Sequence, residues 1–241
     1  MREIFFAEIV YKTAKFALDN RSCIVYTIQI MEKMEDYTMD ALVQKTMEAL
    51  KARQFGAYYA ETSAQAMELL KSFIKEGERV DRGGSMTIEQ IGALDYIKEN
   101  CGYIDAYTVT DMQERAKLMA ARCSCDTFLC SANAIISDGR LYNEDGACSR
   151  VAPMVFGPKQ VIVVAGKNKI VNTEAEAKKR MMTIAAPLNA KRLNTGTPCT
   201  VDGVCHNCDH PNRICCSTVI TNFCRIKERI KVIIVNEDLG L

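Results

Sequence analysis

The 241-residue chain contains no tryptophan, and aromatic residues make up only 7% of it. Proteins that bind single-stranded nucleic acid stack the bases on aromatic side chains, so this composition argues against such a platform. The 31 basic and 30 acidic residues leave a net charge of only +1. A general nucleic-acid binder needs a basic surplus to neutralise phosphates. We therefore expect no nucleic-acid partner.

Long apolar runs are also absent. The longest candidate is the five-residue stretch 161–165, far short of the roughly 18 residues that a membrane-spanning helix needs. Glu3 and Glu8 place acidic groups where a secretory signal would have its apolar stretch. We expect a cytoplasmic protein without a membrane span.

What the sequence does contain is an alternation of strand-like and helix-like segments, beginning near Met39. Thr62, Thr87, Thr110 and Thr173 are each followed three residues later by Gln or Glu, the spacing of a capping box that begins a helix. We expect Pro187 to interrupt the helix that begins at Thr173. Residues 161–165 are typical of a buried strand.

This alternation predicts βαβ units. The fold class that follows is α/β, with a mostly parallel sheet flanked by helices and a cysteine-rich loop near the C-terminus. We assign this domain to residues 39–241. Residues 1–38 lack the pattern, and we interpret them as an N-terminal extension.

The first candidate site is the stretch Gly83-Gly84-Ser85-Met86-Thr87, between a predicted strand and a predicted helix. The backbone N–H groups at such a turn can bind an anion, and open α/β sheets bind ligands at the carboxyl ends of their strands. The glycines allow close approach, and the two hydroxyls add donors. A tight turn that Thr87 caps is the alternative explanation.

The second candidate is the polar stretch 131–150, which contains Asn133, Glu144, Asp145 and Arg150. Either acid could act as a general base, and an arginine can hold a carboxylate with two hydrogen bonds. The alternative is a hairpin rich in turn residues. Of the later basic residues, we interpret 178–180 as a solvated helix face, whereas Lys191 and Arg192 lie where the break at Pro187 would turn them toward a cleft.

The third candidate is the cysteine-rich loop. Six of the twelve cysteines lie between Cys199 and Cys224, and both histidines of the chain lie among them. Thiolates are soft ligands for zinc or an iron–sulfur cluster. The spacing of Cys205 and Cys208 suits one half of such a site, which Cys199 and Cys215 would complete. A redox disulfide and thiols without a role are the open alternatives.

Several blocks of the sequence, taken in order, resemble the LUD domain, the lactate-utilisation family. The resemblance extends from about Met39 to the C-terminus. The blocks are Arg82 to Thr87, Ser131 to Ile135 with the following Asp138-Gly139, Asn143 to Gly146, Phe156 to Lys159, Val163 to Ile170, Ala185 to Asn194, Arg213 to Cys215 and Val235 to Gly240.

The resemblance implies a fold similar to the NagB/RpiA/CoA-transferase group and a cleft for a small carboxylate or phosphate-bearing metabolite. It also implies a part in the oxidation of lactate or similar 2-hydroxy acids, beside iron–sulfur or dehydrogenase partner proteins. The implied cleft is lined by the residues singled out above, with Lys169 added: Gly83, Gly84, Ser85, Thr87, Asn133, Asp145, Arg150, Lys169 and Arg192.

Two hypotheses follow. In the first, the chain is an oxidoreductase or its subunit, in which Glu144 or Asp145 moves protons. In the second, it is a non-catalytic electron-transfer or assembly subunit, in which the loop Cys199–Cys215 carries a metal or an iron–sulfur cluster.

Overall fold

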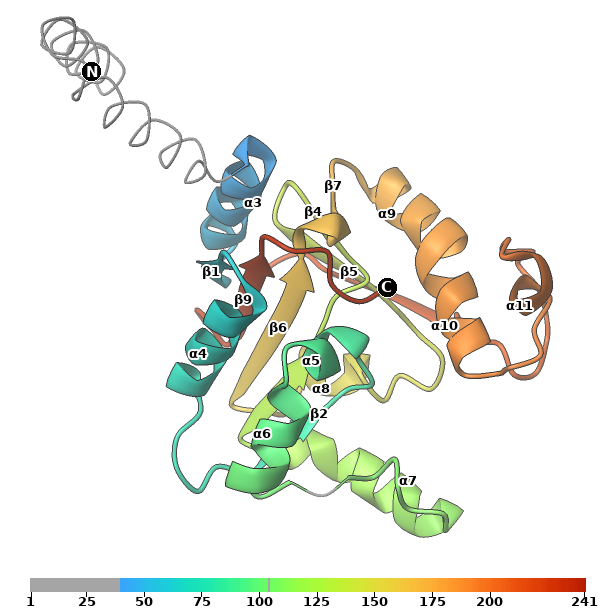
Figure 1. The fold of residues 1–241 in the computed structure, drawn as a ribbon, viewed down its shortest axis with the longest axis horizontal. Coiled ribbons are helices and arrows are strands. Elements are labelled where there is room, and N and C mark those ends of the chain that lie inside the picture. The colour runs from blue at the N-terminus through green and yellow to red at the C-terminus, as the bar shows by residue number, and fades with distance from the viewer. Residues whose placement is uncertain (1–39, 104) are drawn as a thin grey trace, which may run out of the picture. The chain divides into compact units, whose positions relative to one another are not determined.

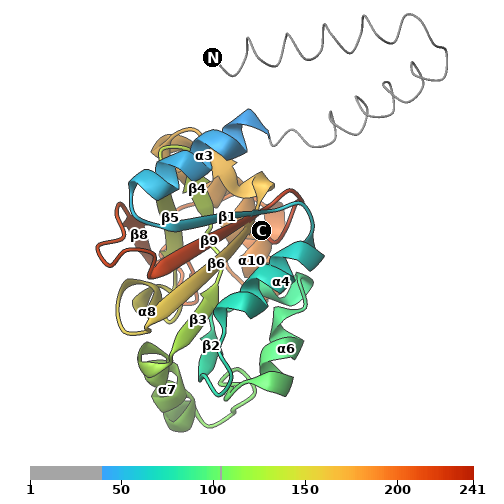
Figure 2. The same ribbon diagram turned by 90° about the vertical axis from the view of Figure 1, so that its left-hand side faces the viewer.

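Five parallel strands form the larger of two sheets, in the order β1-β9-β6-β3-β2 (Figure 1 and Figure 2). The computed structural model describes residues 40–103 and 105–241, so the predicted extension 1–38 lies outside the described residues. The strands are β1 (Gly56–Ala60), β2 (Val80–Arg82), β3 (Thr127–Cys130), β6 (Gln160–Gly166) and β9 (Ile230–Val235). The predicted α/β fold with a mostly parallel sheet is confirmed.

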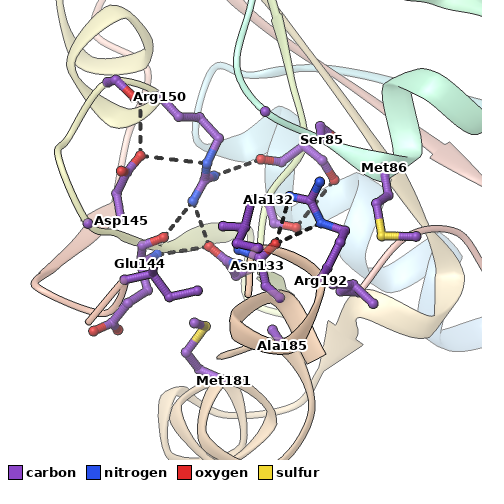
Figure 3. A pocket seen from close by; sticks show the side chains of 18 of the residues that line it. Ser85, Met86, Ala132, Asn133, Glu144, Asp145, Arg150, Met181, Ala185 and Arg192 are labelled. Atoms are coloured by element: carbon purple, nitrogen blue, oxygen red, sulfur yellow. Dashed lines mark hydrogen bonds and ion pairs between the residues drawn. The ribbon is translucent and has the colours of Figure 1, made fainter. Parts of the chain in front are cut away.

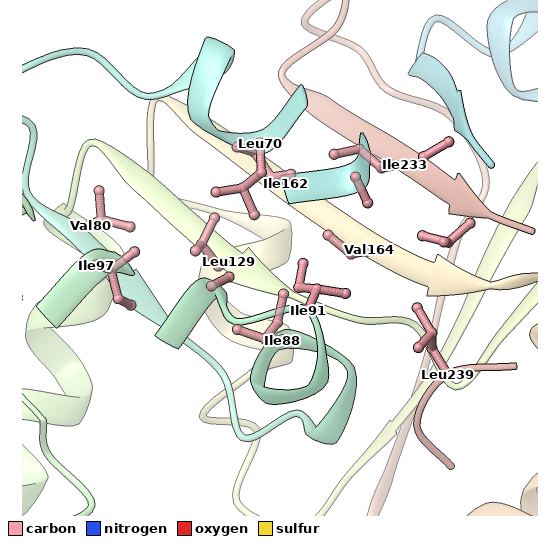
Figure 4. Close-up of a cluster of buried hydrophobic side chains, with 14 residues drawn as sticks. Leu70, Val80, Ile88, Ile91, Ile97, Leu129, Ile162, Val164, Ile233 and Leu239 are labelled. Carbon is pink, nitrogen blue, oxygen red and sulfur yellow. The ribbon is translucent and has the colours of Figure 1, made fainter. Parts of the chain in front are cut away.

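One face of this sheet is covered by helices that the chain forms between its first strands. They are α4 (Ser63–Phe73), α5 (Met86–Gln90) and α6 (Ala93–Asn100), and Figure 2 shows α4 and α6 on the same side of the sheet. Leu70, Ile88 and Ile97 from the three helices pack against Leu129 and Ile162 of the sheet, all fully buried (Figure 4). This cluster is the main core.

The helix starts follow the predicted capping pattern with two exceptions, at Thr87 and at Thr110. The helix after Thr110 is capped by Asp111, which accepts from the N–H of Glu114. The side chains of Thr62 and Thr173 each accept a hydrogen bond from the backbone N–H three residues on, as predicted. Before α5 the cap is Ser85, which has extended backbone and accepts from the N–H of Ile88. Thr87 is instead buried inside the helix, where its hydroxyl is available to another partner.

A second, smaller sheet was not predicted. It contains β7 (Ile170–Val171), β4 (Ala134–Ile136), β5 (Arg140–Asp145) and β8 (Ser217–Thr221), in that order. The turn of the β4–β5 hairpin contains Gly139 at φ +90°, a backbone conformation that favours glycine. β8 then pairs antiparallel with β5 across a long separation in sequence.

The expected break at Pro187 does not occur. α9 (Glu174–Arg180) continues into a π-helical segment, η3 (Met181–Ala185), and then into α10 (Ala186–Arg192). The wider turn of η3 accommodates Pro187 at the start of α10, where its missing N–H costs little. The helix therefore remains continuous.

The remaining elements are short or peripheral. They are α3 (Ala41–Ala52), α7 (Met112–Ala121), η1 (Arg122–Ser124), α8 (Val151–Val155), η2 (Lys167–Lys169) and α11 (Cys199–Asp202). Among the described residues, no helix is both long enough and apolar enough to cross a membrane.

Candidate functional site

A pocket of about 260 Å³ brings together segments from both sheets and from η3–α10 (Figure 3). Three of these segments follow the carboxyl ends of parallel strands: residues 84–86 follow β2, residues 131–133 follow β3, and Lys169 follows β6. This is the edge at which open α/β sheets bind ligands.

Most of the predicted site residues line this pocket. Those that do are Gly84, Ser85, Asn133, Glu144, Asp145, Arg150, Lys169 and Arg192. Gly83 instead packs against Arg150, since a Cβ at this position would lie 2.7 Å from the Cγ of that arginine. Thr87 does not line the pocket itself. Its Oγ1 accepts a hydrogen bond from Nζ of Lys169, which does, at 3.1 Å.

The Arg150 guanidinium is already engaged by the protein. Nη1 donates to the Ser131 carbonyl at 2.9 Å and to Asn143 Oδ1 at 2.6 Å. Nη2 donates to Asn133 Oδ1 at 2.8 Å and to the Glu144 carbonyl at 2.7 Å. Figure 3 shows the bonds of Arg150 to Asn133 and to Glu144. This geometry favours a positioning role for Arg150 over the predicted carboxylate clamp.

The two carboxylates predicted to move protons also have protein partners. Asp145 Oδ2 accepts the backbone N–H groups of Arg150 and Val151, at 3.1 and 3.3 Å. Glu144 Oε2 lies 3.3 Å from the Tyr142 hydroxyl and accepts from Thr218 at 3.0 Å. The proton-transfer role of either acid stays a prediction.

Lys169 is the most unusual group in the pocket. It is only 3% exposed, and its Nζ donates to Thr87 Oγ1 and to Ser131 Oγ, at 3.1 and 3.0 Å. Burial, and to a smaller extent the nearby charges of Arg180 and Arg150, together lower the pKa of Lys169 to about 7. Within residues 40–103 and 105–241, no carboxylate forms an ion pair with it.

The burial of Lys169 comes partly from a close backbone approach. A Cβ on Gly240 would lie 2.9 Å from Lys169 Nζ and 2.3 Å from Thr87 Oγ1. Asn168 Oδ1 holds this segment by accepting the Leu239 N–H at 3.2 Å. The Gly240 backbone thereby contributes to the burial of the ammonium.

Arg180 was missed by the sequence analysis, which assigned it to a solvated helix face. It is 7% exposed, and its guanidinium donates to the carbonyls of Asn168 and Asn133, at 3.2 and 2.8 Å. Burial lowers its pKa. The sequence signal that could have identified Arg180 is its position three residues after the apolar Ala177 and directly before the apolar Met181. Both of these residues are buried in the structure.

Arg192 lies at the exposed mouth of the pocket. Its Nε and Nη2 donate to Asn189 Oδ1, one helical turn earlier, at 3.0 and 2.8 Å. Because α10 is continuous with η3, Met181, Ala185 and Asn189 line the same wall. Arg192 thus lines the pocket without a helix break, whereas Lys191 does not line it.

The four predicted metal ligands lie in the segment that follows α10. Cys199, Cys205, Cys208 and Cys215 are all half-buried. In the described part of the chain, no three His, Cys, Asp or Glu side chains converge as ligands of a single metal ion would. A metal or cluster in this loop therefore stays a prediction.

Comparison with known proteins gives one family. A family model described as the LUD domain matches residues 43–235. A crystal structure of a DUF162 family protein from Deinococcus radiodurans is similar with a TM-score of 0.45 and 13% sequence identity, over 81% of this chain and 96% of that chain. No curated protein matches the chain.

Proposed function

The chain belongs to the LUD domain family, the lactate-utilisation family, and on this premise we propose that its pocket binds a small anionic metabolite through a carboxylate. The family relation points to 2-hydroxy acids such as lactate. The charge and the donors of the pocket support an anion.

The proposal rests on Lys169, whose ammonium has no carboxylate partner among the described residues. A buried ammonium is costly unless it is paired with an opposite charge. Here its protein partners are two hydroxyls, and Arg150 and Arg180 add further positive charge. A ligand carboxylate beside Lys169 would supply the opposite charge that the described protein does not.

Further donors face the same space. The Asn133 side chain accepts two hydrogen bonds through Oδ1, from the Glu144 N–H and from Arg150, which leaves its Nδ2 free to donate to a ligand. Ser85 accepts from the Ile88 N–H at 3.4 Å and keeps its own proton to donate. Arg192 adds a cation at the mouth.

We assign the oxidation itself to partner proteins, either iron–sulfur or dehydrogenase subunits. The reason lies in Glu144 and Asp145, whose carboxylates are both engaged by other groups of the protein. The chain then acts as a subunit or accessory that holds the metabolite. A phosphate-bearing metabolite would suit the same cations and is the second ligand class to test.

The test is titration calorimetry of the full chain with lactate, with a simple phosphate ester as the second ligand. Lys169→Met removes the charge with little change in volume. Because a hydrogen bond to a charged group contributes about 1.5–3 kcal/mol, we expect this variant to lose roughly ten- to a hundredfold in affinity.

Lys178→Met is the matched control, because Lys178 is exposed on α9 and should leave the affinity unchanged. Equal affinity in the wild-type chain and in Lys169→Met would contradict the proposal, and so would no binding of either ligand by the wild-type chain.

A further inference from the structure

The Lys169 amine has a lone pair that neither of its two hydrogen bonds occupies. Its Nζ donates to Thr87 Oγ1 at 3.1 Å and to Ser131 Oγ at 3.0 Å. A neutral amine carries two N–H hydrogens, so these bonds use both of them and leave the lone pair free. Within the part of the chain that the structure describes, no carboxylate lies beside Nζ to hold it as an ammonium. The two hydroxyls therefore satisfy the neutral amine completely.

The electrostatics of the pocket also favour the neutral amine. Burial and the charges of Arg180 and Arg150 lower the pKa of Lys169 to about 7, so about half of the chains carry the free amine at neutral pH. An exposed lysine is almost wholly protonated at that pH and has no lone pair with which to attack a carbonyl. A lysine that is desolvated or lies beside another cation is an activated nucleophile for carbonyl substrates. Lys169 has both properties.

The amine can be reached by a ligand. Although Lys169 is only 3% exposed, it lines the pocket together with Ser131. The donors that suit a carboxylate, Ser85, Asn133 and Arg192, line the same pocket. In a 2-hydroxy or 2-oxo acid, the second carbon is bonded directly to the carboxylate carbon. A ligand whose carboxylate lies beside Lys169 therefore brings its second carbon to the amine.

We propose that Lys169 forms a reversible imine with the carbonyl carbon of a 2-oxo acid that the pocket holds by its carboxylate. This inference rests on the proposed function, because it uses the same carboxylate site. A 2-oxo acid is the product when a 2-hydroxy acid is oxidised. The pocket then treats the two differently, since both pair with the lysine through charge but only the oxo acid has a carbonyl carbon that an amine attacks.

The step needs neither an oxidant nor a reductant. The lone pair of Lys169 Nζ attacks the carbonyl carbon, and an electron pair of the C=O bond moves to the oxygen, which takes a proton. The oxygen then leaves as water with both hydrogens of the amine, and a C=N bond remains. The imine nitrogen takes one proton from solvent, so its positive charge stays beside the ligand carboxylate.

Ser131 is placed to move the proton from nitrogen to oxygen. Its Oγ accepts from Lys169 Nζ, and its own O–H donates to the Ala132 carbonyl at 3.3 Å, which is long for an O–H···O bond. A ligand oxygen that is gaining negative charge is a stronger acceptor than that carbonyl. Ser131 can thus accept a proton from nitrogen and donate its own to the ligand. Thr87 does not line the pocket and lacks this access.

The test is reductive trapping of the full chain with pyruvate, the 2-oxo acid that corresponds to lactate. Cyanoborohydride converts an imine to a stable secondary amine, intact mass spectrometry counts the adducts, and peptide mapping locates them. We expect about one adduct per chain, on Lys169. The map of the wild-type chain tests this without any substitution. No adduct, or adducts spread over exposed lysines without preference for Lys169, would overturn the proposal.

Variants separate the nucleophile from its charge. Lys169→Arg keeps a cation but cannot form an imine, so it should give no adduct, whereas Lys178→Met should react as the wild-type chain does. Ser131→Ala should lower the initial trapping rate by about tenfold or more, and Thr87→Val should lower it less. Circular dichroism establishes that the variants are folded. Equal slowing by Ser131→Ala and Thr87→Val would overturn the proton transfer through Ser131.

Two further probes separate this inference from the proposed function. Acetone has the carbonyl but no carboxylate, so we expect it to be trapped roughly ten- to a hundredfold more slowly than pyruvate, because it lacks the hydrogen bonds to a charged group. Equal rates would overturn the role of the carboxylate. Lactate should compete with pyruvate and slow its trapping.

The outcomes with lactate distinguish the two claims. A chain that binds lactate but gives no pyruvate adduct on Lys169 would overturn the imine and leave the proposed function intact. A pyruvate adduct on Lys169 in a chain that has no affinity for lactate, and whose trapping lactate never slows, would overturn the binding of 2-hydroxy acids and leave the imine intact.

Discussion

Lys169 is buried in surroundings that disfavour its charged form. Its ammonium is enclosed by the Gly240 backbone approach and, within the described part of the chain, donates its hydrogen bonds to the hydroxyls of Thr87 and Ser131. Such an arrangement lowers the stability of the protonated, ligand-free chain. An anionic ligand would relieve this destabilisation, so binding and stability are linked through one side chain.

The lowered pKa of Lys169 predicts how stability changes with pH. The folded chain releases this proton near pH 7, whereas an unfolded lysine keeps it until about pH 10.5. The unfolded state therefore binds more protons between these values, and the free energy of unfolding rises with pH, by up to about 1.4 kcal/mol per pH unit.

Urea unfolding of the wild-type chain and of Lys169→Met at pH 7, 8 and 9 isolates this contribution, since all other groups titrate in both. We expect the stability of the wild-type chain, taken relative to the variant, to rise across this range. A difference that stays constant with pH would show that Lys169 titrates normally in the folded chain.

At the residue scale, the sequence predicted several residues that line the pocket but not the partners that their side chains bind. Ser85, Asn133 and Lys169 were predicted at the site, and they line the pocket. The engagement of Arg150 with four oxygens was not foreseeable, because these acceptors meet only when β5 and the segment after β3 lie side by side.

At the scale of elements, the β4–β5 hairpin depends on one glycine. Gly139 has φ +90°, and a Cβ there would lie 2.5 Å from the backbone carbonyl carbon and oxygen of Ala49 in α3. We expect Gly139→Ala to destabilise the chain by about 2–4 kcal/mol, through left-handed strain and this overlap.

Gly77→Ala is the matched control for the hairpin. Gly77 has φ +76° but nothing within 4 Å of a built Cβ, so this variant should lose only about 1 kcal/mol. Urea unfolding compares the two. Equal losses would mean that α3 moves away from the hairpin without cost.

A buried ion pair joins β2 to η1. Arg122 is fully buried, its Nε lies 3.2 Å from Asp81 Oδ1, and burial raises the pKa of Asp81. Arg122 and Arg82 lie over the ring of Tyr107, at 4.7 and 5.0 Å. Because Tyr107 lines the pocket, this pair supports a pocket wall.

We expect Asp81→Asn to lower the free energy of unfolding by about 3–5 kcal/mol, because it leaves the Arg122 charge buried without its partner. Glu68→Gln is the control, since its pair with Lys71 is exposed and should contribute less than about 1 kcal/mol. Thermal or urea unfolding measures both. Similar losses would show that the buried pair is dispensable.

At the scale of the whole molecule, local patterns predicted the parallel sheet and missed the second one. Caps at Thr62 and Thr173 and the apolar run 161–165 are read from neighbouring residues, and the structure has all three. The pairing of β5 with β8 joins Asp145 to Ser217. No pattern within the sequence of β5 or of β8 indicates that the two strands pair. The pairing, and the part of the pocket wall that it forms, could therefore be seen only in the structure.

The central claim is that an anion supplies the counter-charge of Lys169. The most direct measurement is the pKa of Lys169 itself, by NMR of the full chain with ¹³C-labelled lysine, assigned with Lys169→Met and titrated with and without saturating lactate. We predict a pKa of about 7 in the free chain and a clearly higher value with lactate bound, because the carboxylate favours the charged amine. The same pKa in both states, or an ordinary lysine value in the free chain, would contradict the account.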